Sequence, residues 1–231
     1  MFLPFRRLLL ATLLGTASAA TAAAQEPQPT ESKEAAYTRT ITERAAKIVA
    51  TLGLTDAAKG TQVRDIIAEQ YRKLNDVHEA RKTQLAALKA QPKDDKTEAA
   101  TKKIEDQTTA ALDKLHGKYL KQLSRQLTPA QVDQVKDGMT YRVLPITMAA
   151  YEDMLPTLTE AQKTQMRAWL TEAREHAMDA STSEQKHAWF GKYKGRINNY
   201  LSAAGIDMNQ AGKDWQARIA ARKAAAAPAT N

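Results

Sequence analysis

Residues 63–88, VRDIIAEQYRKLNDVHEARKTQLAAL, decide the fold class of this chain. Their apolar residues recur at steps of three and four, which is the spacing of one face of an α-helix. The segment 91–95, QPKDD, interrupts the pattern, and a second helical stretch follows to about residue 126. Two long helices joined by so short a break fold back on each other. We therefore predict an antiparallel helical hairpin over residues 56–126.

The remaining sequence continues the helical pattern on both sides of this hairpin. Residues 34–52 carry apolar residues at helical steps, and Gly53 is placed to end that helix. Two further helices are expected to start at a repeated Leu-Thr-x-x-Gln signal, at Leu127 and at Leu158. No stretch shows the alternation of a strand. We predict an all-α fold, with the hairpin followed by a compact C-terminal helical bundle at about 129–223, as one domain over 34–223.

The first 33 residues are expected to lie outside that domain. Arg6 and Arg7 precede an apolar run at 8–14 and alanine-rich sequence to residue 24, the order of a cleaved signal peptide over 1–24. Residues 25–33 resemble a disordered leader and 224–231 a disordered tail. The apolar run is shorter than the roughly 20 residues that span a bilayer, so no transmembrane segment is predicted. We expect an exported protein, periplasmic or secreted.

Composition limits the chemistry that is available. The chain has no cysteine, which excludes disulfides, thiol nucleophiles and the lipidated cysteine of lipoproteins. The net charge of +8 would suit nucleic acid, but no nucleic-acid-binding motif accompanies it, so we predict a solvated basic surface and no nucleic-acid partner. No nucleotide-binding fingerprint or serine elbow occurs, and no cofactor is predicted.

The segment 186–201, KHAWFGKYKGRINNYL, is the most unusual in the chain. No acidic residue occurs from Gln185 to Ile206, whereas aromatic and cationic residues are frequent. On a helix, the aromatic stripe that begins at Trp189 favours a core position. Gly191 and Gly195 each cost a helix about 1 kcal/mol relative to alanine, so we expect another helix or a ligand close to them. If a ligand lies there, its binding residues are His187, Trp189, Lys192, Tyr193, Arg196, Asn198 and Asn199.

A second group of polar residues lies on the preceding helix. Glu172, His176 and Asp179 occur at i, i+4 and i+7, on one side of a helix, and could serve as acid and base or hold a divalent metal. Ordinary ion pairing with Arg174 and Glu175 explains the same pattern. Because no second histidine follows at ligand spacing, no metal site is predicted.

Four blocks of this sequence are similar to one known family. They comprise residues 135–141, 154–163, 172–179 and 186–202, and the similarity extends over about 35–215. The chain resembles domain-of-unknown-function family 3826, whose members are exported bacterial proteins with a suggested sugar-binding role. The resemblance implies an oligosaccharide or polysaccharide partner and a place beside polysaccharide-degrading enzymes. It supplies no catalytic residues.

Three functional hypotheses remain at this point. The first is a non-catalytic binder of acidic or plant-type oligosaccharide that uses the Trp189 region. The second is a helical periplasmic chaperone or scaffold that uses the hairpin, because the Leu-Thr-x-x-Gln signal is similar to a motif of small envelope-stress chaperones. The third is an enzyme that uses Glu172, His176 and His187.

Overall fold

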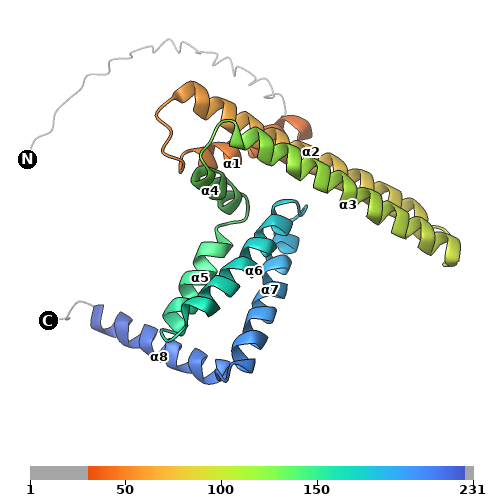
Figure 1. The fold of residues 1–231 in the computed structure, drawn as a ribbon. Coiled ribbons are helices and arrows are strands. Elements are labelled where there is room, and N and C mark those ends of the chain that lie inside the picture. Colours follow the sequence, from red (N-terminus) through yellow and green to blue (C-terminus); the bar gives the residue numbers. More distant parts are fainter. Residues whose placement is uncertain (1–30, 227–231) are drawn as a thin grey trace, which may run out of the picture. The chain divides into compact units, whose positions relative to one another are not determined.

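The computed structural model describes residues 31–226, and these residues form helices joined by short turns, with no strand among them (Figure 1). The all-α prediction is confirmed. The expected signal peptide and most of the expected leader and tail lie outside the described residues. The helices are α1 (Lys33–Val49), α2 (Ala57–Lys89), α3 (Asp95–Ser124), α4 (Pro129–Met139), α5 (Val143–Met154), α6 (Glu160–Met178), α7 (Ser183–Ala203) and α8 (Met208–Ala226).

Helices α2 and α3 lie side by side along their length and make the hairpin (Figure 1). Asp56 caps the start of α2 by accepting hydrogen bonds from the backbone N–H groups of Ala58 and Lys59, and Asp94 caps α3 in the same way. Far along the pair, Arg81 binds both carboxylate oxygens of Glu105 at 2.6 and 2.7 Å. Local caps and one bidentate ion pair therefore set the ends and the register of the hairpin.

Both Leu-Thr-x-x-Gln signals begin helices. Thr128 and Gln131 form a capping box at the start of α4, and Thr159 and Gln162 form another at the start of α6. The motif therefore satisfies the free N–H groups of a first helical turn. Its appearance twice is explained by this local role.

The buried apolar residues divide into two clusters. The N-terminal core contains residues of the four helices α1, α2, α3 and α4, together with Met178 at the end of α6. The C-terminal core joins α5, α6 and α7, with Met208 and Ala211 of α8 at its edge. Gly138 allows the close packing of α4 on α1, since a Cβ at this position would lie 2.8 Å from Ile48 Cγ1.

Helix α8 is attached mainly by polar contacts, because none of its residues is buried. The indole N–H of Trp215 donates to Asp153 at 2.6 Å, and Arg222 binds both oxygens of the same carboxylate. These contacts lower the pKa of Asp153 to about 2, the largest contribution being that of Arg222. None of the helices in the described part of the chain is long and apolar enough to cross a membrane.

Candidate functional site

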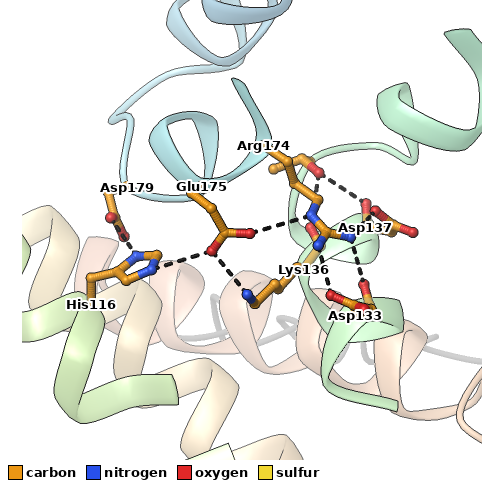
Figure 2. A network of polar contacts seen from close by, with 8 residues as sticks. His116, Asp133, Lys136, Asp137, Arg174, Glu175 and Asp179 are labelled. Carbon is orange, nitrogen blue, oxygen red and sulfur yellow. Dashed lines mark hydrogen bonds and ion pairs between the residues drawn. The ribbon is translucent and has the colours of Figure 1, made fainter. Parts of the chain in front are cut away.

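A network of charged side chains lies between the N-terminal helices and α6 (Figure 2). We call it the polar seam, and it consists of His116, Asp133, Lys136, Asp137, Arg174, Glu175 and Asp179. Arg174 is the most buried member, with a side chain that is 6% exposed. Its guanidinium binds Asp133 at 2.6 Å and Asp137 at 2.8 Å, so α6 is held to α4 by paired charges.

His116 ties α3 to the C-terminal end of α6. Its Nδ1 lies 2.7 Å from a carboxylate oxygen of Asp179, and its Nε2 lies 3.3 Å from Glu175. The hydrogen bond to Asp179, helped by Glu175, raises the pKa of His116 to about 9, so both ring nitrogens donate at neutral pH. The Asp179 oxygen that His116 does not contact is buried and accepts no hydrogen bond from the described residues.

Glu175 binds a second cation of the seam, Lys136, in addition to His116. Lys136 donates to it at 2.9 Å. Burial opposes the ionisation of Glu175, but hydrogen bonds from His116 and Lys136 outweigh it and lower the pKa to about 2. His116 and Glu175 are therefore both charged at neutral pH, and each cation of the seam faces at least one carboxylate.

A cavity of about 550 Å³ opens beside the seam, between the hairpin and the helices α6 and α7. We call it the seam cavity. Its volume is in the range of small-molecule binding sites. Its lining combines both groups of residues that the sequence singled out, since Trp189 and Lys192 lie there together with His176 and Asp179. The hairpin contributes His78, Arg81, Glu105, Thr108, Thr109, Leu112 and Asp113.

Trp189 supplies the aromatic surface of the seam cavity. Its ring stacks on that of His176, with centroids 4.3 Å apart and planes within 16°. The ammonium of Lys192 lies 5.2 Å from the centroid of the same indole. The two neighbours restrict the rotamers of Trp189, so its orientation is set before any ligand arrives.

The hairpin wall of the seam cavity carries both hydrogen-bond donors and acceptors. His78 Nε2 lies 2.7 Å from the backbone oxygen of Asp179 and donates a hydrogen bond to it. Arg81 and Glu105 bind each other across the wall. Asp113 is exposed and has no hydrogen-bond or ion-pair partner in residues 31–226.

The other predicted ligand residues of α7 lie outside the seam cavity. The ring of His187 stacks on that of Tyr141, 5.4 Å away. Arg196 lies over Trp169 at 4.5 Å and near Glu172 at 3.9 Å.

Tyr193 and Ile197 are buried in the C-terminal core. Burial, and then a hydrogen bond with Glu172, raise the pKa of Tyr193 to about 12. Asn198 accepts a hydrogen bond from Tyr151 at 2.6 Å, and Asn199 is exposed.

The expected close neighbour of the two glycines is not found. A Cβ built at Gly191 or at Gly195 would have nothing within 4 Å apart from its own helix. At these two positions α7 packs against no other helix of residues 31–226, and neither glycine lines the seam cavity.

Each residue of the enzyme hypothesis has a structural partner of its own. His176 contacts Trp189, His187 contacts Tyr141, and Glu172 lies beside Arg196. Among residues 31–226, no group of three or more histidine, aspartate or glutamate side chains is arranged to hold a metal ion.

Residues 38–221 match the family described as protein of unknown function, DUF3826. The chain belongs to this family. The match covers every helix of the DUF3826 protein, with only the outermost residues of α1 and α8 beyond it. No curated protein matches the sequence.

Sequence reasoning missed the hairpin residues that face α6 and α7 in this DUF3826 protein. His78, Arg81 and His116 lie among the apolar positions of their helices; for example, His116 lies between Leu112 and the buried Tyr119. A polar residue within a buried stripe indicates a polar partner from another element. That signal was present in the sequence, although it could not identify Asp179 as the partner.

Proposed function

We propose that this chain is an exported, non-catalytic binder of oligosaccharide, with its binding site in the seam cavity. The observation that carries this proposal is that Trp189 and Lys192 of α7 face a hairpin wall of mixed donors and acceptors across about 550 Å³. The wider role, beside polysaccharide-degrading enzymes, follows the family resemblance and is part of the proposal.

The chemistry of the lining suits sugar hydroxyls. A hydroxyl both donates and accepts, so a site that recognises several of them needs both kinds of group. Asp113 is an acceptor without a partner among the described residues. Lys192 is a donor that lies over the Trp189 ring and has no hydrogen-bond or ion-pair partner within residues 31–226. The indole surface supplies apolar contact for the C–H face of a sugar ring.

Binding is favoured over catalysis by the state of the acidic groups. Glycoside hydrolysis uses a pair of carboxyl groups in defined positions. Of the three acidic side chains that line the seam cavity, Glu105 is bound by Arg81 and Asp179 by His116. Asp113 alone is unengaged within residues 31–226, and one carboxylate does not make the pair.

The hairpin does not favour the chaperone hypothesis. A chaperone surface needs exposed apolar side chains that can hold an unfolded client. From Ala57 to Ser124, no large hydrophobic side chain is exposed. The long hairpin instead presents charged side chains, many of them in ion pairs along the helix surface.

Calorimetric titration with xylotriose and trigalacturonate tests the proposal. Trp189→Ala and Lys192→Ala should each weaken binding roughly tenfold, the equivalent of about 1.4 kcal/mol. Arg196→Ala is the matched control, because it also removes a cation from α7. The Arg196 guanidinium lies over Trp169, outside the seam cavity. The affinity of this variant should equal that of the wild type. Absence of binding to both sugars, or an equal loss in all three variants, would contradict the proposal.

A further inference from the structure

A second hollow in the same region is lined by basic and tyrosine side chains. Arg44, Tyr71, Tyr141 and Lys186 line two adjoining recesses of about 610 and 810 Å³. We call these four residues the basic recess. They come from α1, α2, the turn before α5, and the first turns of α7, so four separate parts of the chain meet there.

The basic recess holds positive charge that is not balanced by acids. Lys47 and Arg142 line the smaller recess together with Arg44 and Lys186. The single carboxylate in that lining is Asp137, which is already bound by Arg174 at 2.8 Å. In the larger recess the acidic residue is Glu79, which Lys82 holds. Arg44 has no ion-pair partner among residues 31–226, so its guanidinium remains available to an anion.

Lys186 places a buried charge at the bottom of this region. Its side chain is only 7% exposed, and its ammonium donates to the backbone oxygens of Ala177 and Met178 at 2.9 and 3.0 Å. These carbonyls end α6, where the helix dipole is negative. An ammonium has three N–H donors, so one remains after the two carbonyls are satisfied. The position of that donor is set by the protein before a ligand binds.

The two tyrosines add donors and an open aromatic face. Neither the Tyr71 nor the Tyr141 hydroxyl has a hydrogen-bond partner within residues 31–226, while Tyr141 is 48% exposed. Tyr141 and Arg142 both have left-handed backbone angles, with φ of 58° and 57°. This conformation costs about 1–2 kcal/mol per residue. A backbone hydrogen bond of 2.7 Å from Arg142 to Asp137 holds the turn, and Tyr141 stacks on His187.

We propose that the basic recess binds the carboxylate of an acidic sugar residue. The proposal rests on the proposed function, and assigns the acidic part of the ligand to this recess. The planar guanidinium of Arg44 matches a carboxylate in a two-bond geometry, and the Lys186 ammonium and the Tyr71 hydroxyl supply further donors. The exposed face of Tyr141 provides contact for the sugar ring, which an inorganic anion would leave unused.

The position of the basic recess relative to the seam cavity supports one continuous ligand. The larger recess and the seam cavity have four lining residues in common: His78, Arg81, Ala180 and Gln185. A single oligosaccharide therefore extends from Trp189, where neutral hydroxyls are recognised, to Arg44, where the acid group binds.

Calorimetry with trigalacturonate and with its fully methyl-esterified form tests this assignment, because esterification removes the negative charges and keeps the sugar rings and their hydroxyls. Arg44→Gln should weaken the binding of trigalacturonate roughly tenfold and leave the binding of the ester unchanged. Arg64→Gln is the matched control, since Arg64 is a cation of α2 that lines neither the recess nor the seam cavity. Thermal unfolding of both variants verifies that their folds are intact.

The outcomes separate the two proposals. The wild type could bind acid and ester equally, with both affinities dependent on Trp189 and independent of Arg44. The basic recess then does not bind the carboxylate, and only this inference fails. If the wild type binds neither of these ligands but binds xylotriose, only this inference fails. If it binds none of the three, the proposed function fails as well. If inorganic phosphate binds at Arg44 while trigalacturonate does not, the recess is an anion site unrelated to sugars, and the inference is overturned.

Discussion

The N-terminal core and the polar seam lie next to each other and are held by opposite kinds of contact. The core is built from apolar side chains such as Val63, Ile67 and Leu123, which are fully buried. The seam joins α6 to α3 and α4 through Arg174, His116 and their carboxylates. Apolar packing tolerates many sequences, whereas a buried charge requires its particular partner. The difference indicates that the seam fixes where α6 lies, and hence the geometry of the seam cavity.

The largest effect is expected from removing the central cation of the seam. Arg174→Met keeps the length of the side chain but leaves Asp133 and Asp137 without their partner. We expect a loss of about 3 kcal/mol in the free energy of unfolding, as measured by urea denaturation. Arg167→Met, on the same helix but exposed and 3.9 Å from Glu152, should change it by less than about 0.5 kcal/mol. Similar losses in the two variants would show that the buried ion pairs of the seam contribute no more to stability than an exposed ion pair.

A pair of glycine substitutions tests the apolar side of the comparison. Gly138→Ala places a methyl group 2.8 Å from Ile48 and should destabilise the protein by about 1–3 kcal/mol through overpacking of α1 on α4. Gly195→Ala meets no atom within 4 Å and should stabilise it by about 0.5–1 kcal/mol, because alanine is the better helix former. Thermal unfolding measures both. A destabilising Gly195→Ala would reveal a constraint on α7 that the fold does not contain.

The seam should also make stability depend on pH. The pKa of His116 rises from 6.5 to about 9 through Asp179 and Glu175, so its contribution is complete below pH 6.5 and is lost as the pH rises through 9. The pKa of Glu175 falls from 4.5 to about 2, so its contribution is complete above pH 4.5 and is lost as the pH falls through 2. The seam is therefore strongest between these limits, at about pH 4.5 to 6.5.

His116→Gln isolates the alkaline part of this dependence. We expect the wild type to exceed the variant by about 1–2 kcal/mol at pH 6, after allowing for solvent screening, and by much less at pH 9.5. Urea unfolding at the two pH values measures the difference. Lys186, whose pKa burial lowers to about 8, titrates in both proteins and cancels in the comparison. A difference that stays constant with pH would mean that Asp179 and Glu175 do not raise the pKa of His116.

Much of the fold followed from local signals in the sequence. The periodicity of residues 63–88 predicts a helix that the structure places at Ala57–Lys89, and the two Leu-Thr-x-x-Gln signals predict helix starts that form capping boxes. These features depend on neighbours within a few residues. Of the two neighbours expected at Gly191 and Gly195, the packed helix was wrong, because the helix cost of a glycine does not show what lies against it. The ligand stays a prediction.

Only part of the candidate site could be predicted from the sequence. Trp189, Lys192, His176 and Asp179 were singled out as two separate groups, and the structure brings them into one cavity. The hairpin wall was missed, since His116 and Asp179 are separated by 63 positions and no local pattern links them. Arg44 and Tyr141 were missed for the same reason, because their neighbours in space are far away in sequence.

The three tryptophans of the chain provide the most direct test of the central claim, that oligosaccharide binds in the seam cavity. Each indole N–H gives its own signal in a proton–nitrogen NMR spectrum. Trp189 lines the seam cavity, Trp169 lies under Arg196, and Trp215 is bound to Asp153. Titration with trigalacturonate should shift the Trp189 signal and leave the other two in place. A shift of Trp169 with Trp189 unmoved, or no shift at saturating ligand, would contradict the account.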